Sequence, residues 1–229
     1  MIFLTAVLML HRYQAVQPVG LQSVRNRVLG VVWLSSYRLW DRPRVVHFES
    51  KLEQRVLFML LAGNDVVDLW EQPRFVTYRD LSGQRKYHFF DFLVQFEDGQ
   101  RVAIAVKPEK EVKRMRFMSE LRYIREAISK DFADQVRLIT NSDFTKAEAL
   151  NAERYHDFRR HKDARWMPAL ETALESAALP MTVKQLADSL DLERDGFRAV
   201  VVGIYEGLLE ADRTAPINAE TLVMMGDRP

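Results

Sequence analysis

The chain has 229 residues, of which 48% are hydrophobic and 28% are charged, a composition that is typical of a folded globular protein and excludes a disordered or collagen-like chain. It contains no cysteine, which excludes disulfides, cysteine-ligated zinc, iron–sulfur clusters and thiol nucleophiles. The net charge of +1 hides an asymmetry, because residues 101–165 carry a net +5 and residues 166–229 a net −6.

The first 45 residues are basic and irregular in pattern, and we predict that residues 1–45 form a basic N-terminal arm. Residues 1–10 are apolar but lack the basic flank and the cleavage site of a signal peptide, so a buried strand or a poorly chosen start codon is the expectation there. No apolar run reaches the roughly 18 residues that a membrane span needs. We therefore expect a cytoplasmic protein that does not contact a membrane.

The pattern after the arm predicts one amphipathic helix followed by strands. Apolar residues recur at helical spacing from Ser50 to Leu61, which favours a helix that starts near Glu49. A turn at 81–84 and the hairpin signal Asp98-Gly99 separate the runs that follow. These runs predict strands over residues 66–70, 74–78, 87–96 and 101–107.

The basic middle of the chain continues the alternation of helix and strand. Residues 110–130 carry an apolar stripe with many basic residues around it and are predicted to form one helix, and residues 135–140 form a further strand. This alternation favours an α/β core. Residues 146–165 are strongly charged, which indicates a helix or a linker.

After residue 165 the pattern predicts three helices followed by a two-stranded hairpin, the order of a winged helix. Thr182 is the expected N-cap of the middle helix. The predicted helices span 167–178, 182–190 and 193–209, and the predicted strands span 209–213 and 220–224.

Three charged side chains stand out from this pattern. Asp91 lies within an apolar strand, where a carboxylate is costly unless it is paired or binds a cation. Lys107 ends the next strand, across one hairpin, and Glu53 lies in the first helix, four residues after Glu49. Oxygen ligands without His or Cys favour Mg²⁺ or Mn²⁺, which activates water and screens a phosphodiester. Taken alone, Asp91 is better interpreted as a buried, paired aspartate and Glu53 as a solvated helix residue.

Five motifs nevertheless occur in a fixed order: FESxxE at 48–53, EQP at 71–73, FDFLV at 90–94, an Asp-Gly hairpin, and AIAVKP at 103–108. This run resembles the PD-(D/E)xK nucleases and, in detail, the TnsA-type endonucleases of heteromeric transposases. The resemblance covers about residues 45–145, and the C-terminal segment is similar to the second domain of that family. It implies an α/β restriction-endonuclease-like core with a C-terminal all-α/winged-helix domain.

The resemblance implies that Glu53, Asp91 and Lys107 are catalytic, and that Glu53, Asp91 and the carbonyl of Val106 bind Mg²⁺ or Mn²⁺. The family has Glu, Asp or Gln two residues before the lysine, whereas this chain has Ala105. Alanine offers no side-chain ligand. Three interpretations stay open: a weakened but working nuclease, a natural pseudo-nuclease, and a deliberate inactivating substitution. Phe90 also replaces the proline that usually precedes the aspartate, which affects only backbone shape.

Four basic residues that follow Lys107 are expected to contact the DNA backbone, although such a helix face is often simply solvated. They are Lys110, Lys113, Arg114 and Arg116. The net charge of −6 over residues 166–229 opposes DNA binding and favours protein docking there. We therefore expect a basic arm (1–45), a nuclease-like domain (46–165) and a winged-helix-like protein-docking domain (166–229).

The first functional hypothesis is a Mg²⁺-dependent endodeoxyribonuclease, the subunit of a Tn7-like transposase that cuts the 5′ strand of double-stranded DNA at transposon ends. By resemblance, its partners are a DDE-type recombinase subunit and an AAA+ ATPase regulator that docks on residues 166–229. Two alternatives stay open. One is a phage or defence nuclease of the same superfamily, and the other is a non-catalytic adaptor between DNA and protein.

Overall fold

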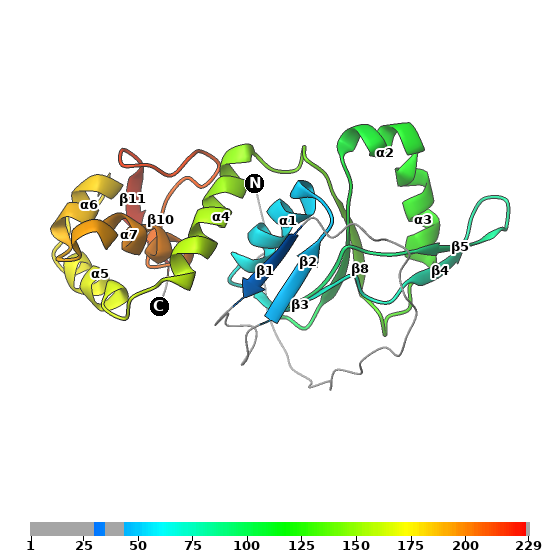
Figure 1. Ribbon diagram of the computed structural model, residues 1–229, viewed down its shortest axis with the longest axis horizontal. Coiled ribbons are helices and arrows are strands. Elements are labelled where there is room, and N and C mark those ends of the chain that lie inside the picture. Colours follow the sequence, from blue (N-terminus) through cyan, green and yellow to red (C-terminus); the bar gives the residue numbers. More distant parts are fainter. Residues whose placement is uncertain (1–29, 35–43, 228–229) are drawn as a thin grey trace. The chain divides into compact units, whose positions relative to one another are not determined.

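The computed structural model describes residues 30–34 and 44–227 (Figure 1). The predictions for residues 1–10, and for most of the basic arm, lie outside the described residues. Within them, β1 (Gly30–Leu34) pairs antiparallel with β2 (Arg44–Phe48). The segment that was expected to be irregular therefore contains a strand pair.

The chain divides into two compact units, residues 1–56 with 65–143 and residues 57–64 with 144–229. The helix α1 (Lys51–Leu61) contributes its first part to the first unit and its last part to the second. Its bounds confirm the predicted amphipathic helix. The functional domain boundaries at residues 45 and 165 stay predictions.

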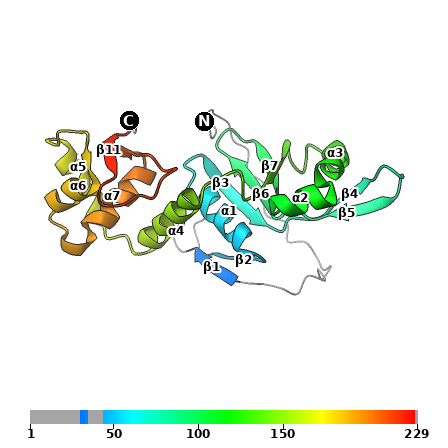
Figure 2. The same cartoon turned by 90° about the horizontal axis from the view of Figure 1, so that it is seen from above.

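A four-stranded sheet in the order β3-β6-β7-β8 forms the centre of the first unit (Figures 1 and 2). The strands β3 (Val66–Glu71), β6 (Phe92–Phe96) and β7 (Arg101–Val106) pair antiparallel, and β8 (Gln135–Ile139) runs parallel to β7. Gly99 turns the β6–β7 hairpin at φ 80°, a conformation that glycine adopts without strain. The first unit is thus a mixed α/β core, as predicted.

The predicted strand over residues 87–96 was wrong in one respect, because the structure breaks it in two. β5 (Arg85–His88) pairs with β4 (Val76–Arg79) in a separate hairpin, and β6 begins only at Phe92. Phe90 is fully buried between them, in the core of the first unit. One apolar run of the sequence therefore contributes strands to two different sheets. Asp91 lies just before β6, the strand in the central sheet.

The predicted helix over residues 110–130 is also two helices, α2 (Glu109–Met115) and α3 (Phe117–Ala127). Arg116 between them has φ 50° and ψ 36°, the left-handed conformation, which ends the first helix and turns the chain into the second. The turn buries Phe117, Leu121 and Ile124 of α3 in the core that the sheet residues Ala103 and Ala105 also line.

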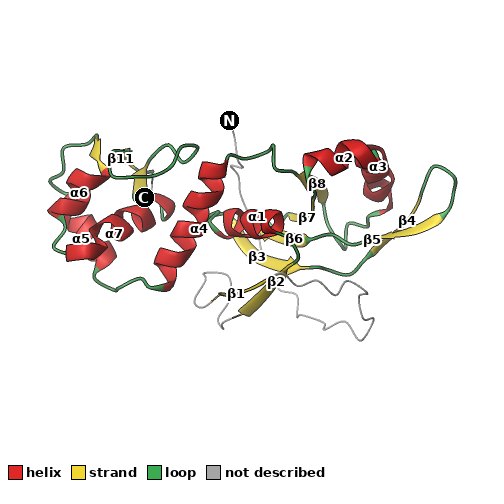
Figure 3. Cartoon of the chain, turned by 45° about the horizontal axis from the view of Figure 1, so that its top comes forward, coloured by secondary structure: helices red, strands yellow, loops and turns green. Residues whose placement is uncertain are grey.

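The described part of the second unit combines four α-helices with a small antiparallel sheet in the order β10-β11-β9 (Figure 3). Thr182 accepts a hydrogen bond from Gln185 N–H and Gln185 accepts one in return, a capping box that confirms the predicted N-cap. In chain order the elements are α4 (Lys146–Arg160), α5 (Trp166–Leu174), β9 (Met181–Thr182), α6 (Val183–Ser189), a 3₁₀ turn (Glu193–Asp195), α7 (Gly196–Tyr205), β10 (Leu209–Glu210) and β11 (Leu222–Met225).

The charged segment that was predicted to be a helix or a linker is the helix α4, and it packs within the second unit. Asn151 is buried and bonds the segment before β11, donating to the carbonyls of Arg213 and Ala215 and accepting from Ile217 N–H. Tyr155 stacks on Tyr205 of α7 at 4.5 Å between ring centroids. These contacts attach α4 to the C-terminal elements. Among the described residues, no helix combines the length and apolar character needed to cross a membrane.

His156 and His161 lie five residues apart with no obvious third ligand, so the sequence predicts that both are surface residues, and for His156 this prediction was wrong. Its side chain on α4 is only 4% exposed, and its ring lies 4.8 Å from the ring of Phe58 between centroids. Burial lowers the pKa of His156 to about 4, and the neighbouring Arg160 adds to the shift. His161 is exposed, as expected.

Acidification should therefore destabilise the second unit. An unfolded histidine titrates near about pH 6.5, so the unfolded state binds more protons than the folded state between that pH and about 4. The stability that neutral His156 gives is complete above pH 6.5 and is lost as the pH falls towards 4, by at most about 3 kcal/mol. Urea unfolding at several pH values should show a weaker pH dependence in His156→Leu than in the exposed control His161→Leu. Equal pH dependence in the two variants would contradict this explanation.

Candidate functional site

Asp91 lies where β6 begins, and its backbone and side chain both bond β7. Its N–H donates to the carbonyl of Ile104 (2.9 Å), the residue that the register pairs with Phe92. Two residues thus lie opposite one, the arrangement of a β-bulge, which redirects a side chain relative to a regular strand. The Asp91 Oδ2 atom accepts a hydrogen bond from Val106 N–H at 2.6 Å. The carboxylate is half-buried and held against the end of β7.

Lys107 follows Val106 directly in the chain, immediately after the end of β7. The N–H of Lys107 donates to the carbonyl of Ile139 on β8 (3.0 Å), which fixes the lysine backbone at the end of the parallel pair. Its Nζ lies 4.9 Å from the ring centroid of Phe117, a cation–π contact that also limits where the ammonium can reach. The structure thus brings Asp91 and Val106 into contact, with Lys107 the next residue along the chain.

Glu53 takes part in the N-terminal cap of α1. Its Oε1 accepts from the Ser50 hydroxyl (2.8 Å) and its Oε2 from Glu49 N–H (2.7 Å), while its own N–H donates to the Ser50 hydroxyl. A carboxylate in the first turn also faces the positive end of the helix dipole. The observed bonds of Glu53 are therefore local, and its predicted catalytic role stays a prediction.

Gln72 connects this helix end to the bulge, a role that the sequence did not indicate. Its Nε2 donates to Glu49 Oε1 (2.7 Å), and its backbone N–H donates to the carbonyl of Asp91 (2.9 Å). The residue adopts φ 42°, which is uncommon for a side chain other than glycine. The chain of bonds from Glu53 through Glu49 and Gln72 to Asp91 joins three of the five motifs of the sequence.

Ala105 does not face solvent. Its side chain is fully buried in an apolar cluster with Phe90, Phe117 and Leu121. A carboxylate at position 105 would replace a methyl group in that cluster, with Lys107 two residues further along the chain. The surroundings of position 105 therefore suit the alanine that the chain has.

The four basic residues that were expected to contact DNA all lie on or directly after α2, and all are exposed. Lys113 pairs with Glu109 at 2.6 Å, so part of its charge is neutralised, and Arg116 occupies the left-handed turn between the helices. Lys110 and Arg114 are the other two. Their contact with DNA stays a prediction.

The donor set has the chemistry of a site for a hard divalent cation with few protein ligands. Within the described residues, no three His, Asp or Glu side chains group closely enough to hold a metal ion together. Mg²⁺, however, usually keeps several waters and is held by only one or two carboxylates together with the substrate phosphate. The Asp91 carboxylate and the nearby backbone carbonyl of Val106 fit that mode.

The left-handed conformation of Gln72 predicts a difference between two substitutions at this position. Gln72→Ala and Gln72→Gly both lose the bond to Glu49, but only alanine keeps the steric cost of the left-handed conformation. Gln72→Gly should therefore be about 1 kcal/mol more stable than Gln72→Ala in chemical unfolding. An alanine variant as stable as the glycine variant would contradict the observed backbone.

Comparison with known proteins agrees with this geometry. Residues 63–159 match the family model described as the TnsA-like endonuclease N-terminal domain, a segment that includes Asp91 and Lys107 but begins after Glu53. No curated protein matches the chain. Residues 63–159 are therefore similar to the TnsA-like endonuclease N-terminal domain, which supports the TnsA-type nuclease that the order of the motifs indicated.

Proposed function

We propose that the chain is the metal-dependent endonuclease subunit of a Tn7-type transposition complex and cuts the 5′ strand at transposon ends. The observation that carries this proposal is the bond from Val106 N–H to the Asp91 carboxylate, next to Lys107 and inside the segment that matches the endonuclease family. This bond places the Asp91 carboxylate against the backbone of Val106, one residue before Lys107. The segment is similar to a family of endonucleases.

In this proposal Mg²⁺ or Mn²⁺ is held by Asp91 and the carbonyl of Val106, with Glu53 as the third ligand. When bound, such a cation supplies charge to the phosphodiester and acidity to a water molecule. The Val106 N–H fixes one oxygen of Asp91, so the carboxylate does not need to reorganise on binding. For Glu53 to serve as a ligand, it must exchange one of its two capping bonds.

Lys107 is the proposed positioning group for the attacking water and for the scissile phosphate. Its backbone is fixed by β8 and its ammonium rests over Phe117, so the charge stays near the end of β7. As an ammonium at this place, the lysine attracts the phosphate and orients the water. Glu49 and Gln72 act through Asp91 and are positioning residues.

The acidic C-terminal segment supports a protein-docking role. The order α5, β9, α6, α7, β10 and β11 supports assignment as a winged helix, and the net charge of residues 166–229 is −6. Leu222 and Met224 on β11 are exposed and line a hollow of about 430 Å³. Apolar surface with acidic charge suits a protein partner better than DNA. The proposed partners are an AAA+ ATPase regulator on this segment and a DDE-type recombinase subunit.

A specific observation favours a second candidate, a non-catalytic adaptor. Ala105 is fully buried in an apolar cluster, and the described residues contain no group of three potential metal-binding side chains. A chain that had lost cleavage would keep the DNA surface and the docking segment and lose only the metal. Metal binding and strand cutting therefore separate the two candidates.

The nuclease proposal predicts nicking of a labelled transposon-end duplex in Mn²⁺ with the partner recombinase present. Asp91→Asn keeps an oxygen that can accept the Val106 N–H bond but loses the charge, so nicking should fall at least about 100-fold while the fold persists. Lys107→Ala should reduce nicking by a similar factor. Arg160→Glu on α4, an exposed charge reversal of the second unit, serves as the control. Absence of cutting by the unchanged chain, with no Mn²⁺ binding, would leave the adaptor.

Restoring a carboxylate at position 105 provides an independent test. Ala105→Glu should lower the unfolding temperature without metal, because it buries a charged and larger side chain. Mn²⁺ should then raise the unfolding temperature of this variant, since a ligand that binds only the folded state stabilises it. Ala105→Met, of similar volume but without ligand oxygens, should be destabilised and gain nothing from Mn²⁺. Equal responses to Mn²⁺ in the two variants would contradict a metal site beside position 105.

A further inference from the structure

The hairpin of β4 and β5 has two different faces. Its inner face packs on α3: Val76 and Tyr78 are buried in the core of the first unit, and the Tyr78 hydroxyl donates to Glu120 of α3. Burial, with the bond to Glu120, raises the pKa of Tyr78. A two-stranded hairpin is marginal by itself, so these contacts hold the ribbon in place and fix which side chains point outwards.

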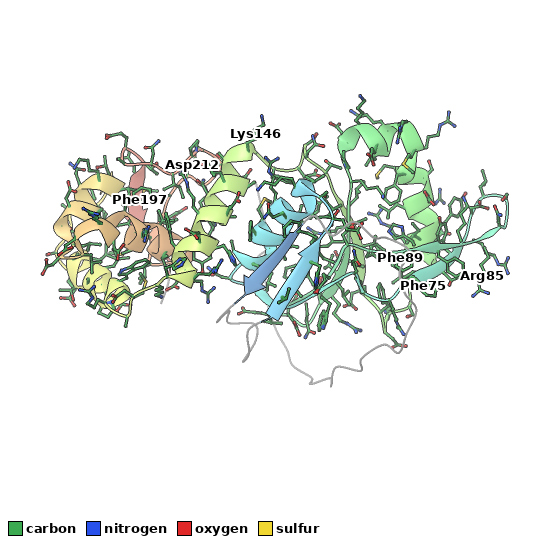
Figure 4. The ribbon with its side chains drawn as sticks, in the orientation of Figure 1. Phe75, Arg85, Phe89, Lys146, Phe197 and Asp212 are labelled. Carbon is green, nitrogen blue, oxygen red and sulfur yellow. The ribbon has the colours of Figure 1, made fainter. Side chains whose placement is uncertain are left out.

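The outer face carries three exposed aromatic rings. Phe75 is 37%, Tyr87 55% and Phe89 41% exposed. They form one cluster, since the Phe75 ring lies 5.2 Å from that of Tyr87 and 5.6 Å from that of Phe89 between centroids. Figure 4 labels Phe75 and Phe89 at the base of the hairpin and Arg85 further towards its tip. Exposed aromatic clusters of this kind mark binding surfaces.

The same face carries positive charge that exceeds the acidic charge of the hairpin itself. Arg79 lies directly opposite Arg85 in the register, and like charges in that position destabilise a strand pair. Arg85 lies over the Tyr87 ring at 5.6 Å. The one acid of residues 74–89, Asp80, pairs with Lys86 at 3.0 Å and caps the turn, so it does not neutralise the two arginines.

We infer that the outer face of the β4–β5 ribbon, formed by Phe75, Arg79, Arg85, Tyr87 and Phe89, binds duplex DNA beside the nuclease site. Residues 74–89 contain four basic residues and one acidic residue, so a polyanion is the occupant that this charge favours. The major groove of duplex DNA is wide enough to admit a two-stranded ribbon. Arginines at the sides would contact phosphates, and the rings would contact bases or sugars.

This inference rests on the proposed function but concerns a surface that the metal site does not include. The ribbon is joined to the site along the chain, because β5 runs through Phe89 and Phe90 into Asp91. DNA bound on the ribbon would therefore be held close to the bulge that carries the carboxylate. The alternative occupant of this face is a partner protein, and the test below distinguishes it from duplex DNA.

The test is equilibrium binding of the full chain to a fluorescent duplex over a range of salt concentrations, in Ca²⁺ without Mg²⁺ or Mn²⁺. Arg79→Gln with Arg85→Gln should weaken binding and lower the slope of log affinity against log salt by about 1 for each phosphate that the arginines no longer neutralise. Phe75→Ala and Tyr87→Ala should each weaken binding with little change in that slope, because the rings supply apolar contact with groove edges and no charge. Thermal unfolding of each variant checks that the hairpin remains folded.

Matched controls come from α4, where Leu150→Ala removes an exposed apolar side chain and Arg160→Gln an exposed charge. Unchanged binding in folded ribbon variants, while the unchanged chain binds duplex, overturns this inference and leaves the nuclease proposal intact. The inference is also overturned if the ribbon variants lose binding to single-stranded DNA but keep binding to duplex. The same holds if they lose only binding to the recombinase. Failure of the unchanged chain to bind DNA overturns both proposals.

Discussion

The bond from Val106 N–H to the Asp91 carboxylate is the constraint on which the rest of the site depends. It ties the start of β6 to the end of β7 at a bulge, where two residues oppose Ile104. The bulge separates one apolar run into two strands, so that one half completes the central sheet and the other forms a ribbon on α3. The same interaction places the Asp91 carboxylate against the backbone of Val106, the residue before Lys107.

Gln72 extends this constraint to the first helix. Gln72 adopts a left-handed backbone conformation. Its backbone N–H donates to the Asp91 carbonyl, and its side-chain amide donates to Glu49. The N-terminal end of α1 is therefore linked to the bulge by hydrogen bonds. Three motifs that are far apart in the sequence, at 48–53, 71–73 and 90–94, belong to one hydrogen-bonded network. Ala105 lies outside that network, with its side chain buried in the apolar core of the first unit.

Local signals made much of the fold predictable. The spacing of apolar residues predicted α1, Asp98-Gly99 predicted the hairpin, and Thr182 predicted the cap of α6. The breaks at Asp91 and Arg116 were not predictable, since neither has glycine or proline to mark it and each depends on tertiary contacts. Gln72 was missed because its partner Glu49 lies 23 residues away. The order of the motifs singled out Asp91 and Lys107, whose catalytic roles stay predictions, but spacing alone could not show that position 105 turns into the core.

The most direct test of the central claim is to locate a bound cation through backbone cleavage. Fe²⁺ in place of Mg²⁺, with ascorbate and peroxide, generates hydroxyl radicals that cut the polypeptide next to the metal. We expect cuts near Asp91 and between Ala105 and Lys107, competed by Mg²⁺ and absent in Asp91→Asn. Cuts confined to other segments, or an unchanged pattern in Asp91→Asn, would contradict a metal site at the bulge.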